Sequence, residues 1–195
     1  MEPITSIIKG CISNDHKYQK ILYERYYGFA LKIVFRYIFK YERARDVVND
    51  GFVKLFINLP SFEADHASNT EKTLMGWIRR IMINAAIDEL RRMQLLPGIV
   101  SIPDEVWNIA DKGANAEQAL MYRDLVLLLN RLPEQYRLVF NLYVIDGYSH
   151  QEVADSLNIS VGNSKSILSR ARTLIQKFIK AEEQIIYVSP EARYG

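Results

Sequence analysis

Three stretches in the first half of the chain repeat apolar residues at the three- and four-residue spacing of an amphipathic helix. They cover residues 16–41, residues 42–59, and a third stretch from about Thr73 to Met93. Between the second and the third, residues 61–71 are polar and lack this periodicity. The pattern therefore predicts three helices, with a loop before the third.

A second group of helical signals begins near residue 117. Glu117–Asn130 is amphipathic, and Glu134–Asp146 is expected to form the next helix, with Pro133 as its first helical residue. Gly147 follows at a position where a left-handed residue commonly ends a helix. Two helices joined by a short turn are therefore predicted for this region.

The segment between the two groups has a different composition. Residues 95–116 contain Pro97, Gly98, Pro103 and Gly113, and this composition is typical of a linker. We therefore predict an all-α chain with two helical domains. The expected divisions are residues 1–94, a linker at 95–116, a second domain at 117–183 and a tail at 184–195.

Residues 148–180 have the pattern of a helix-turn-helix. Ser149 and Glu152 have the spacing of a capping box, in which each side chain accepts a hydrogen bond from the other residue's backbone N–H. The short helix that follows is expected to end at Leu157, and Ala154 is small enough for two helices to cross there. The shared core would consist of Val153, Leu157, Ile159 and Leu168.

The last helix is predicted over Val161–Lys180, with Asn158 in a left-handed turn and Ser160 as the cap. Short polar and basic side chains occupy its outward positions, and such groups suit base edges and phosphates of duplex DNA. These residues are Asn163, Lys165, Ser166, Ser169, Arg170 and Arg172. A plain αα-hairpin within a bundle is the alternative interpretation.

The third predicted helix carries a second candidate surface. Arg80, Asn84, Asp88 and Arg91 lie three or four residues apart and therefore share one face, close to Trp77. Cations, an amide and an aromatic ring together suit a single strand with an unpaired base. The alternative places Trp77 in the core and makes Asn84 and Asp88 a buried polar pair.

Charge is unevenly distributed along a chain whose net charge is only +2. Residues 158–180 contain five Lys or Arg and no acidic residue, whereas residues 95–120 contain one Lys and four acids. The last helix should therefore attract a polyanion that the linker repels. A solvated helix face is the alternative explanation of the basic run.

Other features exclude several classes of protein. No apolar run reaches the roughly 18 residues that a membrane span needs, so we expect no membrane insertion. Cys11 is the single cysteine, which fits a reducing compartment, and we expect a cytoplasmic protein. His16, His66 and His150 are scattered without metal-ligand spacing. We predict no metal, no cofactor and no enzymatic activity, since the Cys11–His16 pair is a weak catalytic candidate.

Three motifs in this order resemble those of the extracytoplasmic-function (ECF) class of bacterial RNA polymerase sigma factors. This class keeps the second and fourth conserved domains of the larger sigma-70 family. The similar segments are RARDVVNDGFVKLF at residues 43–56, the helix at residues 77–92 and the stretch at residues 132–172. In the family these are a polymerase clamp-binding helix, a −10 element helix and a −35 element domain.

The resemblance implies a sigma factor that binds core RNA polymerase and directs promoter-specific transcription initiation. It would recognise the −35 element as double-stranded DNA and the −10 element as melted DNA, and assist melting. Many relatives are also held by an anti-sigma factor. The implied polymerase-binding residues are Asp46, Asn49, Asp50 and Phe52. The implied −10 residues are Trp77, Arg80, Asn84, Asp88 and Arg91, and the −35 residues are the six outward ones of the last helix.

Four residues depart from the family pattern, and one of them, Asn158 in place of the usual Gly, is a mild change. Ser164 stands where a β-branched apolar residue is usual, and we expect its hydroxyl to bond back to the Ser160 carbonyl. Ile167 replaces a common Arg and is expected to contact a thymine methyl. Ile83 replaces a basic residue, which would remove or shift one strand contact.

The main alternative function is a stand-alone, dimeric helix-turn-helix transcriptional regulator. It predicts a ligand-binding or phosphorylation domain before the DNA-binding part, and residues 16–93 show no sign of one. A helical adaptor would also fit the periodicity, but it leaves the basic last helix unexplained.

Overall fold

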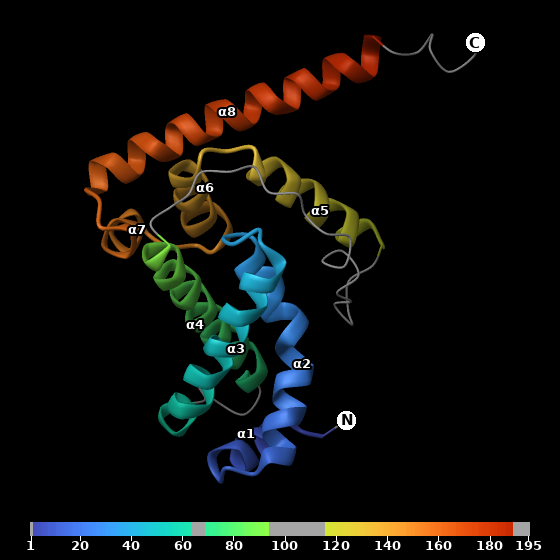
Figure 1. The fold of residues 1–195 in the computed structure, drawn as a ribbon, viewed down its shortest axis with the longest axis vertical. Helices are drawn as coiled ribbons and strands as arrows, with labels where there is room; N and C mark the ends of the chain where they lie inside the picture. The colour runs from blue at the N-terminus through green and yellow to red at the C-terminus, as the bar shows by residue number, and fades with distance from the viewer. Residues whose placement is uncertain (1, 64–68, 94–115, 189–195) are drawn as a thin grey trace, which may run out of the picture. The chain divides into compact units, whose positions relative to one another are not determined.

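The computed structural model describes residues 2–63, 69–93 and 116–188, and all regular elements within these ranges are helical (Figure 1). Contacts within the chain divide its described residues into two compact units, one before residue 94 and one from residue 118 onward. The predicted all-α fold class is confirmed. Residues 95–115 of the predicted linker lie outside the described residues.

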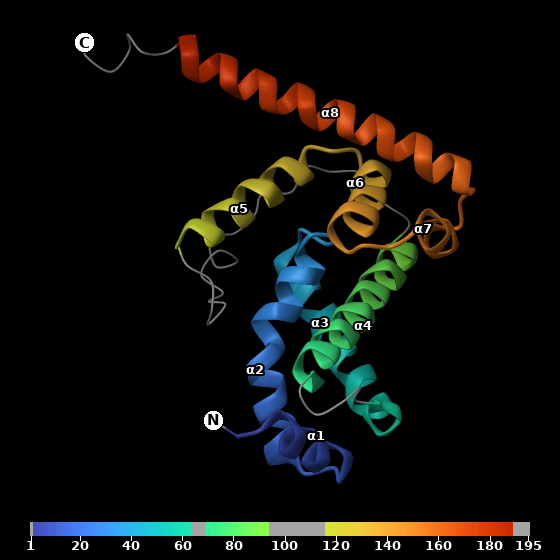
Figure 2. The same cartoon turned by 180° about the vertical axis from the view of Figure 1, so that it is seen from behind.

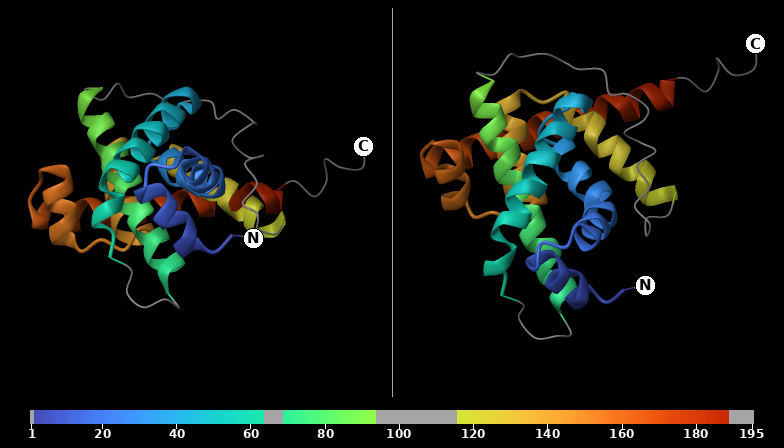
Figure 3. Two further views of the ribbon diagram at one scale, coloured as in Figure 1. Left: turned by 90° about the horizontal axis from the view of Figure 1, so that it is seen from below. Right: turned by 60° about the horizontal axis from the view of Figure 1, so that its bottom comes forward.

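The first unit is a helical bundle. Its helices are α1 (Ile4–Ile12), α2 (His16–Phe35), α3 (Tyr41–Asn58) and α4 (Thr70–Arg92), with a 3-10 turn, η1 (Leu59–Ser61), after α3. Helices α2, α3 and α4 pack side by side, as Figures 1 and 2 show from opposite sides. Helix α1 packs against α2, which Figure 3 shows from two further directions.

The core of this bundle follows the predicted periodicity. Helix α3 keeps the predicted span closely, and α4 begins at Thr70 and ends at Arg92, close to the expected helix over residues 73–93. Fully or almost fully buried side chains come from all three long helices: Leu22, Tyr26, Ala30, Val48, Phe52, Leu55, Leu74, Ile78, Met82 and Ala86. Each buried aliphatic or aromatic side chain contributes about 1.5–3 kcal/mol.

Helix α2 is shorter than the predicted helix over residues 16–41. It begins after Asp15, whose side chain accepts a hydrogen bond from Lys17 N at 2.9 Å, and it ends at Phe35. The next apolar residues, Tyr37, Ile38 and Phe39, are all buried. The last helical residues, Ile33, Val34 and Phe35, are buried as well, so burial continues past the end of the helix and does not mark where it stops.

Helix α1 was not predicted from the sequence. Its buried side chains are Ile7, Ile8 and Cys11, and no side chain caps its beginning. Gly10 lets α1 approach α2 closely, because a Cβ at this position would lie 2.3 Å from Tyr18 Cγ. The position of α1 therefore depends on a tertiary contact rather than on a local signal.

Within the described residues, the second unit contains four α-helices and one π-helical turn. These are α5 (Ala116–Asn130), α6 (Glu134–Phe140), the π-helical turn η3 (Asn141–Ile145), α7 (His150–Leu157) and α8 (Val161–Val188). The predicted helix over residues 134–146 is thus an α-helix that continues as a π-helical turn. Pro133 is the N-cap of α6 rather than its first helical residue.

The predicted turns and caps of this unit are confirmed. Gly147 has φ +76° and Asn158 has φ +53°, so both adopt the left-handed conformation. The capping box of Ser149 and Glu152 is present at the start of α7. Ser160 Oγ accepts a hydrogen bond from Asn163 N at 3.1 Å, as expected for the cap of α8.

Helix α8 extends beyond the predicted end at Lys180 and reaches Val188. The expected tail at residues 184–195 therefore begins within a helix. The remaining residues, 189–195, lie outside the described part of the chain.

We predict that Gly10→Ala destabilises the first unit by about 1–2 kcal/mol. The added methyl group overlaps the Tyr18 ring, at a cost of about 1–3 kcal/mol, which the better helix propensity of alanine offsets in part. Gly76→Ala is the matched control, because a Cβ on this α4 glycine meets nothing within 4 Å. Urea unfolding followed by circular dichroism should show Gly76→Ala gaining about 0.5–1 kcal/mol. Equal stabilisation of both variants would contradict the α1–α2 contact.

Candidate nucleic-acid interface

Helices α7 and α8 cross through a small apolar core. Val153, Ala154, Leu168 and Ala171 are at most 3% exposed. Helices α7 and α8 are in direct contact, and both also contact the α6–η3 segment. The predicted crossing residue Ala154 and the predicted core residues Val153 and Leu168 are thus buried, whereas Leu157 and Ile159 are only partly buried.

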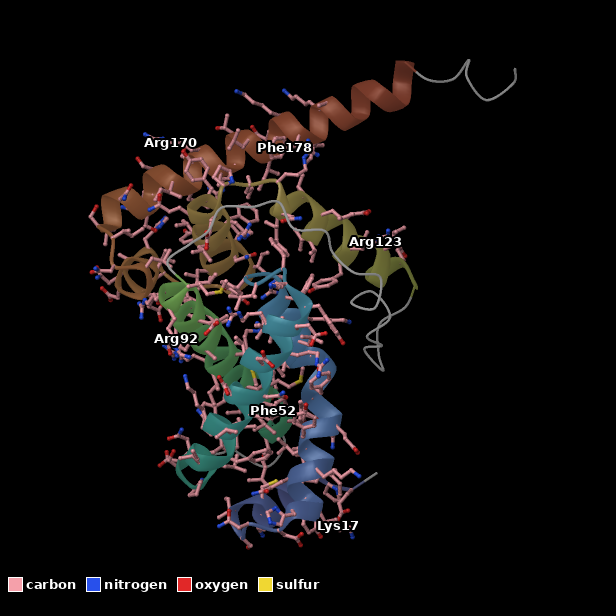
Figure 4. The ribbon with its side chains drawn as sticks, in the orientation of Figure 1. Lys17, Phe52, Arg92, Arg123, Arg170 and Phe178 are labelled. Atoms are coloured by element: carbon pink, nitrogen blue, oxygen red, sulfur yellow. The ribbon has the colours of Figure 1, made fainter. Side chains whose placement is uncertain are left out.

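The inward side of α8 determines which residues face outward. Its buried residues are Ser164, Ile167, Leu168 and Ala171, at the three- and four-residue spacing of one helix face. All six residues predicted to contact the −35 element are exposed: Asn163, Lys165, Ser166, Ser169, Arg170 and Arg172. Figure 4 shows Arg170 on the side of α8 that faces away from α6 and α7. We call these six residues the outward face of α8.

The outward face of α8 is electropositive. Within the ranges that the structure describes, Lys165, Arg170 and Arg172 form no ion pair, and no acidic residue lies between positions 158 and 180. Their charge is therefore available to an anionic partner. A duplex whose phosphates they neutralise would bind with a strong salt dependence.

Ser164 does not form the expected side-chain bond to the Ser160 carbonyl. Its buried hydroxyl lies 2.9 Å from His150 Nδ1, on the first residue of α7. The Tyr143 ring stacks on the His150 ring, with centroids 4.2 Å apart and planes inclined by 23°. Burial, followed by the charges of Lys165 and Arg172, lowers the pKa of His150, so the neutral ring prevails near pH 7.

Two other departures from the family pattern, Ile167 and Ile83, are also core residues. Ile167 is 3% exposed, so the expected contact with a thymine methyl is wrong for this structure. Its side chain lies on the inward side of α8, next to Leu168. Ile83 is fully buried in α4. Both apolar residues therefore stabilise their own unit.

The predicted −10 surface lies along α4. Arg80, Asn84 and Arg91 are exposed, so the alternative of a buried Asn84 is wrong. Asp88 is 43% exposed and forms ion pairs with Lys54 Nζ at 3.3 Å and with Arg91 Nη1 at 3.5 Å. Asp88 therefore holds Arg91 on the surface and connects α4 to α3.

A second ion pair connects the same two helices. Glu89 is 11% exposed, and its carboxylate lies 3.1 Å from Arg43 Nη1 of α3 and 3.5 Å from Arg92 Nη1. Neither Lys54 nor Arg43 is indicated as a partner by the sequence pattern. More than 30 residues separate each from its acid, so no local spacing signals these pairs.

The beginning of α4 is anchored by aromatic and polar contacts. Trp77 is half-buried, and its ring packs against Phe62 with centroids 5.2 Å apart. Glu71 accepts a hydrogen bond from the Tyr26 hydroxyl at 3.0 Å and is paired with Arg25. Trp77 is thus partly accessible at the edge of the bundle.

The predicted polymerase-binding residues lie on α3. Asp46, Asn49 and Asp50 are exposed, and Asn49 Oδ1 accepts a hydrogen bond from the Tyr23 hydroxyl at 2.9 Å. Phe52 differs, because it is 2% exposed and packs against Tyr23 with ring centroids 4.7 Å apart. Figure 4 labels Phe52 within the bundle. Its assignment as a partner contact is therefore wrong for this structure.

The weak candidate for catalysis is not supported. Cys11 is buried, and burial, with a smaller effect of Asp15, raises the pKa of its thiol to about 11. Its reactive thiolate is therefore scarce at neutral pH. Within the described ranges, no three His, Cys, Asp or Glu side chains are placed to hold a metal ion. None of the described helices combines the length and apolar character needed to cross a membrane.

Two parts of the chain match models of known protein families. Residues 22–95 match "Sigma-70 region 2", and residues 122–175 match "Sigma-70, region 4". The first match contains the α3 and α4 surfaces, and the second contains the helix-turn-helix.

Similar proteins carry related names. The ECF RNA polymerase sigma-E factors of Escherichia coli (strain K12) and Salmonella typhimurium (strain LT2) are each 29% identical over 184 residues, covering 89% of this chain and 93% of the relative. The ECF RNA polymerase sigma factor SigM of Mycobacterium tuberculosis is 28% identical over 138 residues, covering 71% of this chain and 65% of the relative.

Two solved structures are similar to the chain. One is CnrH in complex with the cytosolic domain of CnrY, at 22% identity and a TM-score of 0.45, covering 90% of this chain and 96% of that one. The other is the sigma factor RpoE in complex with the anti-sigma factor NepR from Bartonella quintana. It is 23% identical, with a TM-score of 0.48, and covers 85% of this chain and 97% of that one.

Proposed function

The chain belongs to the sigma-70 family, in its ECF class, and from this premise we propose that it binds core RNA polymerase and directs promoter-specific transcription initiation. The region 2 and region 4 matches follow one another along the chain, as they do in the resemblance found from the motifs. The region 2 match covers the part that a stand-alone dimeric regulator would use for a ligand or a phosphate. That alternative is therefore not favoured.

The outward face of α8 is the observation that carries the proposal. Six polar or basic side chains are exposed there, above an apolar crossing that keeps the opposite side of the helix buried. An α-helix of this kind fits the major groove of B-DNA. We assign the earlier positions, Asn163, Ser166 and Arg170, to base edges of the −35 element, and Arg172 to phosphates.

We assign recognition of the melted −10 element to α4. Arg80 and Arg91 would contact phosphates of the single strand, while Asn84 and Trp77 would contact an unpaired base. Asp88 would orient Arg91 through their ion pair instead of contacting DNA itself. Binding an unstacked base offsets part of the few kcal/mol that unpairing costs, so binding and melting become coupled.

We assign polymerase binding to the exposed residues Asp46, Asn49 and Asp50 of α3, without Phe52. The ion pairs between α3 and α4 would then hold the polymerase-facing and the DNA-facing side chains on one rigid support.

The remaining assignments follow from this role. Sigma factors are not enzymes in general, and we assign the chemistry of transcription to the polymerase. We place the protein in the cytoplasm, because core RNA polymerase works there. We keep residues 1–94 as the clamp- and −10-binding domain, 95–116 as the linker and 117–183 as the −35-binding domain. An anti-sigma factor as a further partner stays a prediction from the family resemblance.

Run-off transcription with core polymerase, this protein and genomic fragments tests the proposed function. We expect transcripts from a small set of fragments that share two sequence elements upstream of the start. Core polymerase alone should not produce them. An identical transcript pattern with and without the protein would refute the proposal.

We predict that Asp46→Ala together with Asp50→Ala weakens binding to core polymerase by at least about tenfold, which is about 1.4 kcal/mol. Both carboxylates are exposed and form no ion pair among the described residues, so the fold should be unaffected. Glu117→Ala with Asp124→Ala is the matched control, because it removes the same charge from exposed positions on α5 that also form no ion pair among the described residues. Fluorescence anisotropy of the labelled protein measures the affinity. An equal loss of affinity for core polymerase in both double variants would show that net charge alone causes the effect.

We predict that Arg170→Ala costs about 1–3 kcal/mol of affinity of the holoenzyme for its promoter, as expected for a base contact. Lys180→Ala, also exposed on α8 but beyond the matched region 4 segment, is the matched control and should change the affinity little. Mobility shifts on promoter and random duplexes measure both affinities. Should Arg170→Ala weaken the two duplexes equally, Arg170 contacts phosphate and not a base.

A further inference from the structure

A polar contact lies within the otherwise apolar crossing of α7 and α8. Ser164 is the fourth residue of α8 and is fully buried, with its hydroxyl 2.9 Å from His150 Nδ1. His150 is the first residue of α7, and Tyr143 of η3 stacks on its ring. The contact thus joins three consecutive elements of the helix-turn-helix unit.

A buried hydroxyl is costly to leave without a hydrogen-bond partner. A neutral imidazole has one donor and one acceptor nitrogen, so His150 satisfies Ser164 whichever of the two carries the proton. Ser164 needs this hydrogen bond more than His150 does, because Ser164 is completely buried and His150 is only partly buried.

The contact lies within the part of α8 that carries the outward face. Asn163 and Lys165 flank Ser164, and Ser166 follows; all three are exposed. Successive residues of an α-helix are rotated by about 100° around its axis, so fixing the direction of Ser164 fixes the directions of its neighbours. A small rotation of this turn would move all three side chains relative to a base pair.

We propose that His150, supported by Tyr143, is a positioning residue that sets the rotation of α8 through Ser164 and thereby determines the sequence specificity of −35 binding. This inference rests on the proposed function. His150 contacts no DNA in this scheme and acts through the helix that does. The hydrogen bond between Ser164 and His150, with Tyr143 stacked on His150, also explains why a serine is tolerated at a core position of α8.

The test is a double-variant cycle measured with the reconstituted holoenzyme at pH 7.5. His150→Phe keeps a ring for Tyr143 to stack on but leaves the Ser164 hydroxyl without its partner. Ser164→Ala removes the hydroxyl, and the combined variant removes both groups. Affinities are measured for the promoter duplex recovered by run-off transcription and for the same duplex with a scrambled −35 element.

We expect His150→Phe to reduce the affinity for the promoter about tenfold, which lies within the range of coupling between contacting residues. The affinity for the scrambled duplex should change by less than about twofold. The combined variant should bind the promoter better than His150→Phe alone, because no buried hydroxyl then lacks a partner. Ser149→Ala is the control for stability. It removes the capping box of α7, and it should lower the unfolding free energy without changing the ratio of the two affinities.

Each outcome is decisive. If the wild-type holoenzyme prefers the promoter over the scrambled duplex and His150→Phe keeps the same ratio of affinities, the positioning role is overturned. The proposed function then still stands. A ratio that falls equally in Ser149→Ala shows a purely structural effect and also overturns it. A wild type that does not distinguish the two duplexes refutes the proposed function, and the inference falls with it. Urea unfolding of the wild type and the three variants of the cycle needs no DNA. It shows whether His150 and Ser164 are coupled in the folded protein, and it therefore distinguishes a failure of the inference from a failure of the proposed function.

Discussion

The crossing of α7 on α8 is the constraint on which the DNA-binding surface depends. Ala154 provides the small residue at the contact, and Leu168 and Ala171 bury one side of α8 against it. Because a helix has a fixed period, burying this side exposes the opposite one. Six polar and basic residues face outward as a consequence of packing, and no separate interaction is needed to hold them there.

In the first unit, ion pairs between helices also fix the direction of exposed side chains. Two ion pairs, Lys54–Asp88 and Arg43–Glu89, connect α3 to α4 next to a continuous apolar core. Exposed pairs contribute about 0–1 kcal/mol, so the half-exposed Lys54–Asp88 pair adds little to stability compared with the core. Its value is geometric, because it fixes the direction of charged side chains on a surface assigned to DNA.

Local signals could be predicted from the sequence with good accuracy. The capping box at Ser149, the left-handed residues Gly147 and Asn158, and the cap at Ser160 each depend on residues within a few positions, and the structure contains all of them. Helix periodicity gave α3 and α4 for the same reason. Exposure of the six outward residues of α8 followed from that periodicity once the buried side was known.

Features that depend on distant residues could not be predicted. Helix α1 is placed by the fit of Gly10 against Tyr18, and the partner of Ser164 is 14 positions away. Phe52 is instructive, because the family resemblance assigned it to a partner contact, yet its side chain is buried and packs against Tyr23.

Site-directed cleavage of promoter DNA tests the central claim most directly. In a Cys11→Ala background, Ser166→Cys places the chain's only cysteine on the outward face of α8, where an iron chelate can be attached. We expect that the holoenzyme bound to its promoter then cleaves both strands within the −35 element. Cleavage confined to other parts of the promoter, or none above the level of an unmodified holoenzyme, would contradict it.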